Sequence, residues 1–477
     1  MRRVLSVASE AVPLVKTGGL ADVVGALPEA LSGQGWDMRV MIPAYRGVID
    51  RLGRTTVVWS DPDIYGASAE LHLGKIGAMH VMALDAPHLY DRAGGPYSDI
   101  HGDFGDNAER FAALCWAAAA VARDGAGDWK PDILHAHDWQ GALAPAYLRY
   151  SGSSLPSLVT IHNIAFQGRV GAEKMGALRL PREAFHRDGY EFWGDISTLK
   201  AGLTSADAIT TVSPRYADEL MRGEYGQGLE GVIAARAGVV IGILNGIDAG
   251  VWNPEKDTDC IPFSANSLAA KSKNRKTLQA EFQLEKKIDG PLVILVSRLT
   301  AQKGIDLLPA AVEELVARGG ALAVLGSGDA WAEDLVLGLA ARFPGRVGVR
   351  IGYDEALSHR MFAGGDAVLV PSRFEPCGLT QLYGLRYGCL PLVAAVGGLA
   401  DTVIGATPAT LAAQAATGFV FHPVDALALR QATRRLCELY ADRKTWTAMM
   451  KRAMKSELGW ESSAARYAAL YERLLAQ

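Results

Sequence analysis

A lysine and two glycines near the start of the chain, in Lys16-Thr17-Gly18-Gly19-Leu20, have the composition of an anion-binding loop. The two glycines let the backbone approach a ligand closely, and residues 20–31 have helical apolar spacing. The unpaired N–H groups of a helix start attract an anion, and the Lys16 ammonium adds a full charge. The segment predicts a phosphate-binding loop, although a plain strand-to-helix turn with a solvated lysine has the same pattern.

Two further cations, Arg298 and Lys303, follow the strongest apolar run of the second half of the chain. A turn separates them, so both side chains can converge on one phosphate. Arginine grips a phosphate with two hydrogen bonds, whereas lysine acts as a point charge. Their place directly after a buried strand favours this interpretation over two solvated surface cations.

A carboxylate lies in the third motif, Arg373-Phe374-Glu375-Pro376-Cys377-Gly378-Leu379, which precedes a helical pattern at 379–386. Here Glu375 would lie beside another anion site at a helix start. Alternatively, Glu375 caps that helix. Cys377 is expected to be a small buried residue, because no histidine lies near it in sequence.

Histidines follow two other apolar runs, in His135-Ala136-His137-Asp138-Trp139 and in His162-Asn163. His135 and His137 would share one face of a strand end. With Asp138 they could bind a metal, but a polar sugar-binding edge above Trp139 is the better interpretation, and His135 also suits a hydrogen-bonded core position. Tyr353 follows a strand as well and could stack on a base, although a surface tyrosine is as common.

Short apolar runs that alternate with helical patterns place these motifs in an α/β fold with parallel sheets. Residues 57–83 have closer turns and predict an antiparallel excursion. The pattern predicts two doubly wound domains with a joint near 246–251, and an amphipathic packing helix at 460–475. Ligands bind outside the carboxyl ends of such strands, so we expect the substrate between the domains. The predicted strands are 4–8, 39–42, 133–135, 158–161, 209–212, 292–297, 321–326, 347–351, 367–370 and 392–394.

Bulk properties narrow the class of partner. The 477 residues carry 48 basic and 52 acidic side chains, a net charge of −4, so nucleic acid and anionic membranes are poor candidates. Five scattered cysteines suggest neither a disulfide framework nor a zinc site. A neutral polymer, or a small anion held by a few local cations, fits this charge better. With no signal peptide and no bilayer-spanning run expected, the default location is the cytoplasm.

Taken together, the motifs resemble those of bacterial glycogen synthase and its plant relative, starch synthase. They span nearly the whole chain in family order. The matching segments are 16–23, 135–139, 160–163, 244–248 (which contains Asn245), 297–299, 302–304, 373–379 and 396–403.

The resemblance implies a retaining hexosyltransferase that adds glucose from ADP-glucose to the non-reducing end of an α-1,4-glucan. It also implies two Rossmann-like domains that face a deep cleft (GT-B type), with no cofactor and no metal. The implied domains are 1–245 on the acceptor and glucose side and 246–456 on the nucleotide side. Residues 457–477 would then form a C-terminal helix that crosses back to the first domain.

Roles for individual residues follow from the same resemblance. Breaking the glucosyl–phosphate bond loads negative charge on ADP, which Arg298, Lys303 and the turn at Gly378 would stabilise. The loop Lys16-Thr17-Gly18-Gly19 would approach the pyrophosphate and glucose. Glucose would be contacted by His162, Asn163 and Glu375, and adenine by Tyr353. Asp138 would hold hydroxyls of the glucose or of the acceptor. Asn245, Cys377, Leu379 and Thr380 complete the implied donor-binding set.

One departure from a common pattern limits the mechanism. Many transferases of this architecture carry two glutamates eight positions apart, whereas here Tyr383 takes the place of the second glutamate after Glu375. The glycogen and starch synthase branch shares this loss, which favours front-face displacement over a second carboxylate. Three alternatives stay open: a transferase that makes a small disaccharide, a sugar-nucleotide epimerase, and a glucan-binding protein with a decayed site.

Overall fold

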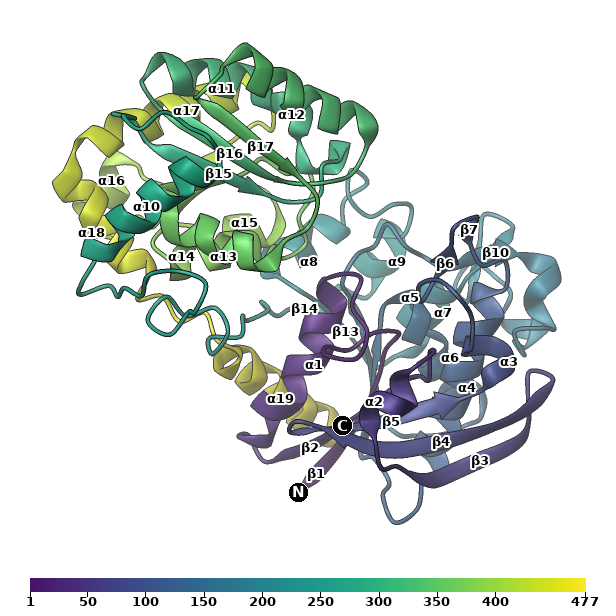
Figure 1. The fold of residues 1–477 in the computed structure, drawn as a ribbon. Helices are drawn as coiled ribbons and strands as arrows, with labels where there is room; N and C mark the ends of the chain where they lie inside the picture. The colour runs from purple at the N-terminus through teal and green to yellow at the C-terminus, as the bar shows by residue number, and fades with distance from the viewer. The chain divides into compact units, whose positions relative to one another are not determined.

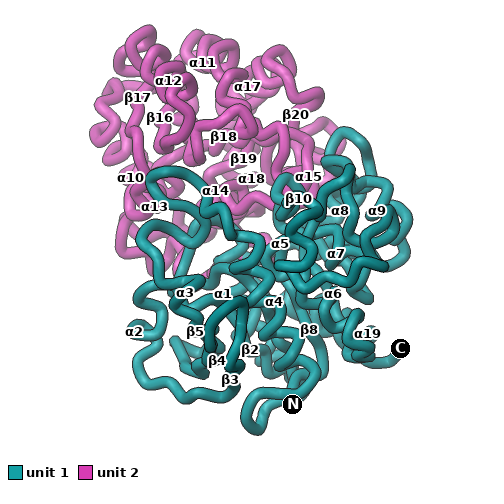
Figure 2. Tube along the Cα trace, turned by 90° about the vertical axis from the view of Figure 1, so that its right-hand side faces the viewer, with its two compact units in different colours: residues 1–246, 460–477 teal, residues 247–459 magenta.

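The computed structural model describes all residues, 1–477, and the chain divides into two compact units. Unit 1 comprises residues 1–246 and 460–477, and unit 2 comprises residues 247–459 (Figure 2). Each unit is built on a largely parallel sheet with helices packed against it. This arrangement confirms the predicted α/β class with two Rossmann-like domains.

The sheet of unit 1 has nine strands in the order β14-β13-β9-β8-β1-β2-β5-β4-β3. Six strand pairs are parallel, whereas β4 runs antiparallel to both β3 and β5, as the sequence predicts for residues 57–83. Because β5 pairs with β2, this excursion extends the main sheet. The strands are β1 Arg2–Val7, β2 Trp36–Pro43, β3 Thr56–Ile64, β4 Ala67–Ile76, β5 Met79–Asp85, β8 Ile133–His137, β9 Ser157–Ile161, β13 Ala208–Thr211 and β14 Val240–Gly242.

Alternate residues of β1 face the two sides of this sheet, as a strand buried on both faces requires. Leu5 belongs to the hydrophobic cluster that contains α4 and α6, and Val4 to the cluster that contains α19. The helices of unit 1 are α1 Gly19–Ser32, α2 Val48–Leu52, α3 Pro87–Tyr90, α4 Asn107–Asp124, α5 Asp138–Gly141, α6 Leu143–Tyr150, α7 Thr198–Ser205, α8 Pro214–Leu220, α9 Glu230–Ala235 and α19 Trp460–Leu475.

The C-terminal helix α19 has the predicted bounds and lies in unit 1. The Tyr471 hydroxyl lies 2.8 Å from Nδ1 of His135, and its ring packs edge-on against Trp36. Helix α19 therefore closes one face of the first sheet.

Unit 1 also contains two small sheets. The strands β10 Arg169–Gly171, β12 Asp195–Ser197 and β11 Glu191–Phe192 form an antiparallel sheet beside α7 (Figure 1), and β6 Ser98–Asp99 pairs with β7 Gly102–Asp103. None of these strands exceeds three residues, so the sequence carries no period-2 pattern that could predict them.

The sheet of unit 2 has six parallel strands in the order β17-β16-β15-β18-β19-β20. Three predicted strands have the observed bounds, while β20 was not predicted because it is only three residues long. The strands are β15 Leu292–Val296, β16 Ala321–Gly326, β17 Val347–Ile351, β18 Ala367–Val370, β19 Leu390–Ala394 and β20 Phe419–Phe421.

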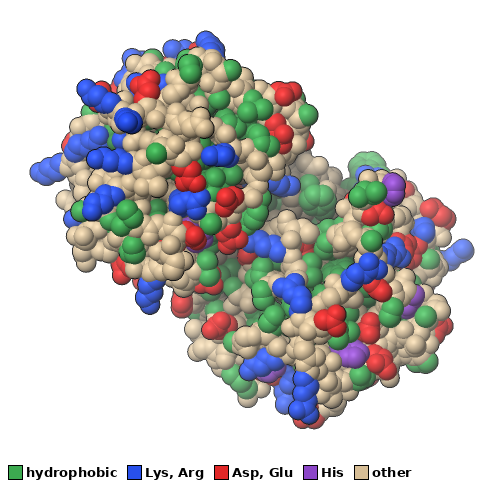
Figure 3. Space-filling model, viewed as in Figure 1, with side chains coloured by type: hydrophobic (Ala, Val, Ile, Leu, Met, Phe, Trp, Pro, Cys, Tyr) green, Lys and Arg blue, Asp and Glu red, His purple; other side chains and the backbone are tan.

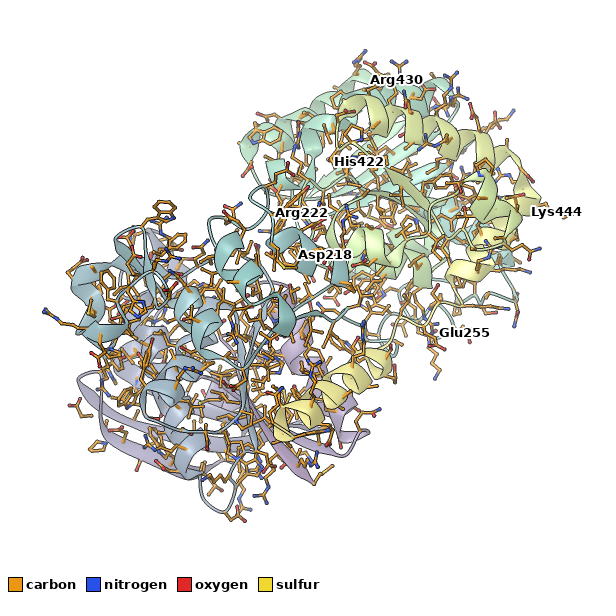
Figure 4. The ribbon with its side chains drawn as sticks, turned by 180° about the vertical axis from the view of Figure 1, so that it is seen from behind. Asp218, Arg222, Glu255, His422, Arg430 and Lys444 are labelled. Atoms are coloured by element: carbon orange, nitrogen blue, oxygen red, sulfur yellow. The ribbon has the colours of Figure 1, made fainter.

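Helices cover both faces of this second sheet, with α11, α12 and α17 on one side and α13, α14 and α15 on the other (Figure 1). Glu314 of α11 pairs with Arg318 and with Arg430 of α17, which is labelled in Figure 4. The helices are α10 Ala269–Glu281, α11 Leu308–Ala317, α12 Ala330–Arg342, α13 Glu355–Gly364, α14 Thr380–Arg386, α15 Gly397–Thr402, α16 Pro408–Ala412, α17 Ala426–Ala441 and α18 Arg443–Ala453.

Surface charge agrees with the near-neutral composition. Acidic and basic side chains are interspersed over most of the face in Figure 3, and Lys and Arg are more frequent along the edge near α10 and α18. None of the helices is both long and apolar enough to cross a membrane.

Candidate active site

The loop Lys16-Thr17-Gly18-Gly19 leads into α1 in an exposed position of unit 1. Gly18 is the N-cap, with no side-chain cap, and the Lys16 ammonium donates to Asp22 Oδ1 at 2.8 Å. A Cβ atom added to Gly18 or Gly19 would meet no protein atom within 4 Å. Internal packing therefore does not require these glycines, and the open backbone suits a ligand that approaches closely.

A buried carboxylate, Glu10, holds this loop in place. The backbone N–H of Thr17 and the Tyr97 hydroxyl both donate to Glu10, and the Thr17 hydroxyl lies 2.5 Å from its Oε1. Glu10 follows β1 at its carboxyl end, the position at which polar ligand-binding residues are expected in this fold. Sequence reasoning overlooked Glu10 and Tyr97, although the place of Glu10 after an apolar run was a usable signal.

Three histidines form a connected row at the ends of β8 and β9. The rings of His135 and His137 stack with centroids 4.1 Å apart, and Nδ1 of His137 lies 3.0 Å from Nε2 of His162. His135 also bonds Thr160 and Tyr471 inside the core. Burial lowers the pKa of His135 and of His162 to about 3, so both imidazoles are neutral at pH 7.

This row decides between the two interpretations of His135. His135 is a hydrogen-bonded core residue, one of the alternatives that the sequence left open. Trp139 packs edge-on against Phe111, and a Cβ atom on Gly168 would meet its ring at 2.5 Å, so the indole supports the core beneath the loop.

Asp138 turns the chain sharply between β8 and α5. Its φ of 49° is left-handed, and Oδ1 accepts the backbone N–H groups of His162 at 2.7 Å and Asn163 at 3.3 Å. Burial raises the pKa of the Asp138 carboxyl to about 7, and these two N–H donors oppose the rise. Asp138 thus fixes the His162-Asn163 backbone, and the strained conformation is of the kind found at functional sites.

The two predicted asparagines differ in their partners. Asn163 Oδ1 accepts the N–H of Ala165 at 3.0 Å, which shapes a local turn. The Oδ1 atom of Asn245, at the end of unit 1, is buried and has no protein donor. A buried amide oxygen in this state is available to a donor group on a ligand.

In unit 2 the central feature is an ion pair between Lys303 and Glu375. The Lys303 ammonium donates to Glu375 Oε2 at 2.5 Å, and the Ser372 hydroxyl donates to the same oxygen at 2.8 Å. Both charged side chains are largely buried, with 17% and 11% exposed. Glu375 therefore does not cap α14, because its carboxylate is bound to Lys303 and the N-cap of that helix is Leu379.

The turn from Glu375 to α14 is held by the side chain of Gln381 and a left-handed glycine. Gly378 has a φ of 72°, and the Gln381 amide donates to the carbonyl oxygens of Cys377 and Gly378 at 3.0 and 2.8 Å. Leu379 and Thr380 follow as the N-cap and first residue of α14. Cys377 is buried, as the sequence predicts.

The second copy of the Gly-Gly-Leu-Ala-Asp pattern packs against this turn. A Cβ atom on Gly397 would lie 2.0 Å from the Glu375 carbonyl oxygen, and one on Gly398 would lie 2.2 Å from that of Cys377. The N–H of Gly398 also donates to the Glu375 carbonyl. Here the glycines are needed for internal packing, unlike Gly18 and Gly19 of the first copy.

Arg298 and Tyr353 are the most exposed members of the predicted set in unit 2. Arg298 lies after β15 with its side chain exposed and without an ion pair, so it does not share a partner with Lys303. Tyr353 is 81% exposed, and its hydroxyl donates to Glu355 at 2.8 Å. Both side chains are accessible to a ligand without loss of core packing.

A cluster that the sequence did not indicate lies between the 250–259 loop and α13. Asp257, Asp259 and His359 bring potential ligand atoms within 4.8 Å of one another beside a cavity of about 410 Å³. Asp257 already accepts Nδ1–H of His359 at 2.8 Å and the Tyr387 hydroxyl, and Trp252 stacks on His359. We interpret the cluster as a set of hydrogen bonds that holds the 250–259 loop against His359 of α13 and against Tyr387.

The two units therefore present different chemistry. Unit 2 offers buried and exposed cations with a glycine turn, which suits a diphosphate. Unit 1 offers carboxylates, neutral histidines and an open loop, which suit a polyhydroxylated substrate.

Comparison with known proteins agrees with this division. Residues 3–235 match the family described as starch synthase catalytic domain, and residues 290–438 match glycosyl transferases group 1. The chain is 58% identical to a glycogen synthase of Cereibacter sphaeroides over 476 residues, 99% of each chain. It is 55% identical to one of Paracoccus denitrificans over the whole of both chains.

Solved structures give the same result. The catalytic domain of starch synthase IV from Arabidopsis thaliana, bound to ADP and acarbose, matches with a TM-score of 0.87 and 30% identity over all of both chains. A sucrose-phosphate synthase from Thermosynechococcus elongatus matches with a TM-score of 0.62 and 21% identity, a likeness of fold alone.

Proposed function

The chain belongs to the glycogen and starch synthase family of glycosyltransferases, and from this premise we propose that it elongates an α-1,4-glucan with glucose from ADP-glucose. The donor class is supported by the ADP in the related starch synthase structure and by the cations of unit 2. The observation that carries the proposal is the buried Lys303–Glu375 pair beside the Gly378 turn, a preformed arrangement for a diphosphate and its sugar.

In this proposal unit 2 binds the leaving nucleotide. Arg298 and Lys303 neutralise the charge that develops on the phosphate as the glucosyl bond breaks, which is electrostatic stabilisation by preorganised groups. Glu375 holds the Lys303 ammonium in place and accepts glucose hydroxyls. The exposed Tyr353 ring packs on the adenine, and Cys377, Gly378, Leu379 and Thr380 supply the backbone around the phosphates.

Unit 1 then binds glucose and the acceptor. Lys16 and the open amides of Gly18 and Gly19 bind the donor at its glucose–pyrophosphate junction. His162 and Asn163, whose backbone is fixed by Asp138, contact the glucose, and Asn245 accepts a hydrogen bond through its buried oxygen.

The transfer step is a front-face displacement. The bond between glucose C1 and the phosphate oxygen breaks, the acceptor O4 forms the new bond to C1 on the same face, and the O4 proton passes to the departing phosphate oxygen. The products are ADP and a glucan one residue longer, with the α configuration retained. A covalent glucosyl-enzyme adduct would contradict this step.

One assay distinguishes this function from its alternatives. The enzyme is incubated with glycogen and either ADP-glucose or UDP-glucose labelled in glucose, and both polymer label and nucleotide release are measured. We expect the label to appear in the polymer, with one ADP released for each glucose transferred. Three results would each contradict the proposal: label in a soluble disaccharide, conversion of the donor sugar in the absence of an acceptor, or binding of glycogen without release of ADP.

A further inference from the structure

The tight turn between β11 and β12 carries a tryptophan in a strained conformation. Trp193 and Gly194 form a two-residue connection, with φ angles of 55° and 87°. Two positive φ angles define a type I′ hairpin turn, in which Asn, Asp and Gly are favoured. The left-handed conformation is unfavourable for a bulky residue, so Trp193 destabilises the turn that it occupies.

The tryptophan gains no burial that would offset this strain. Its side chain is 81% exposed, and Phe166 on a neighbouring segment is 61% exposed. Exposed aromatic side chains that lie on adjoining segments of one surface mark a binding site. Strain and exposure together therefore point to a ligand for the indole ring.

The turn itself is firmly anchored. The buried Lys200 ammonium donates to the carbonyl oxygens of Arg187, at 2.6 Å, and Glu191. The N–H of Gly194 donates to the Glu191 carboxylate at 2.7 Å, and the Arg169 guanidinium lies over the Phe192 ring. Because its base is fixed at these points, the turn can present the indole in one orientation.

The surface continues towards the predicted glucose-binding residues. The N–H of Phe166 donates to the Asn163 carbonyl at 3.3 Å, and the Gln167 amide donates to the Gln227 carbonyl at 2.9 Å. The next residue, Gly228, touches the other aromatic segment, since a Cβ atom there would lie 3.7 Å from Nε1 of Trp193. Asn163, Phe166 and Trp193 thus lie on contacting segments of unit 1.

We propose that Trp193 and Phe166 form a glucan-binding platform that holds the acceptor chain beyond its reacting end. Each pyranose ring has a face of C–H groups that packs on a flat aromatic ring, while its hydroxyls bond the indole N–H and water. A glucan that passes Asn163 reaches Phe166, whose N–H is bonded to the Asn163 carbonyl, and then Trp193 on the contacting segment. The inference rests on the proposed function, because it assigns the platform to the acceptor of that reaction.

The test uses Trp193→Asn, because asparagine is favoured in a type I′ turn and the fold is retained. We expect the KM for glycogen to rise about three- to tenfold, the effect of losing one aromatic contact. The KM value for ADP-glucose stays unchanged, and the melting temperature stays equal or rises as the strain is relieved. Trp193→Phe, which keeps a ring, should retain most of the glycogen affinity.

The matched control is Trp331→Ala on α12, which removes another exposed tryptophan, 43% exposed, from unit 2. An unchanged KM for glycogen in Trp193→Asn, or an equal rise in Trp331→Ala, would overturn the platform. Migration in a glycogen-containing native gel, measured without donor, separates the two proposals. If the wild type fails to transfer glucose, the proposed function is wrong. If glycogen still slows the wild type in the gel but no longer slows Trp193→Asn, the platform is supported all the same.

Discussion

The Lys303 ammonium lies 2.5 Å from Glu375 Oε2, which joins two loops that are 72 residues apart at the carboxyl edge of the second sheet. Ser372 donates to the same carboxylate oxygen. A pair buried to this extent is costly to break, because removing one partner leaves an uncompensated charge away from water. Its position beside the Gly378 turn means that the same two groups organise the fold of this edge and the proposed chemistry.

Replacing one member of this pair should separate the two roles. Lys303→Met is expected to lower the free energy of unfolding by about 3–5 kcal/mol and kcat by about 100-fold or more. Lys303→Met combined with Glu375→Gln removes both charges, so stability recovers while activity does not. Urea unfolding and initial rates at saturating donor measure both effects, and recovery of kcat in the double variant would refute the catalytic role of Lys303.

The two glycine motifs should respond oppositely to alanine. In Gly18→Ala the added Cβ atom meets no protein atom within 4 Å, and the φ of −153° suits any residue. We therefore expect the free energy of unfolding to change by less than about 0.5 kcal/mol. We expect donor affinity to fall because the added methyl blocks the open backbone. Gly397→Ala, with a Cβ atom 2.0 Å from a carbonyl oxygen, should cost about 2 kcal/mol or more in unfolding free energy. Equal stability of the two variants would contradict this assignment.

Lys16 should matter for donor chemistry and little for the fold. Its side chain is 48% exposed and pairs with Asp22, so Lys16→Ala should cost at most about 1 kcal/mol of stability. We expect kcat/KM for ADP-glucose to fall by about 10- to 100-fold, since a phosphate-binding charge is lost. Lys444→Ala, at the exposed start of α18 (Figure 4), is the control and should keep wild-type kinetics. Wild-type turnover in Lys16→Ala would refute its role.

The buried histidines should make stability fall in mild acid. Burial lowers the pKa of His135 and His162 to about 3 and that of His137 well below its ordinary value. An unfolded imidazole has a pKa of about 6.5, so below that pH the unfolded chain binds more protons. Stability then falls by up to about 1.4 kcal/mol per pH unit for each histidine. Asp138 acts oppositely between pH 7 and about 4, because burial raises its pKa to about 7.

The histidine contribution can be isolated in one variant. His137→Gln keeps a hydrogen-bonding side chain but cannot titrate, so its unfolding free energy should depend less steeply on pH than that of the wild type. Urea unfolding at pH 7, 6 and 5 gives both slopes. Identical slopes would mean that the row of histidines does not set the acid sensitivity.

The sequence predicted the fold class and most central strands, because buried parallel strands are continuous apolar runs between helices. Residues 321–326, 347–351 and 367–370 have the observed bounds for this reason. The strands at 419–421 and 169–171 are too short for any period to emerge. Their pairing depends on tertiary contacts that sequence spacing does not encode.

The site was predictable in its motifs and unpredictable in its contacts. Lys303 and Glu375 each follow a predicted strand, which is where ligand-binding residues are expected. The ion pair between them could not be predicted, because it depends on the strand order of unit 2. The role of Glu10 was overlooked, although its place after the apolar run of β1 was a usable signal. Trp139 packs beneath the 135–139 segment, where the sequence predicted it, but its partner Phe111 lies in another helix and could not be named from spacing.

The direct test of the proposed function is the product formed from ADP-glucose and maltotriose, followed by proton NMR and by nucleotide release. We predict maltotetraose with a new α-1,4 linkage at the non-reducing end, one ADP for each glucose transferred, and loss of this product in Lys303→Met. A β-linked product, free glucose, or a donor altered without acceptor would contradict it.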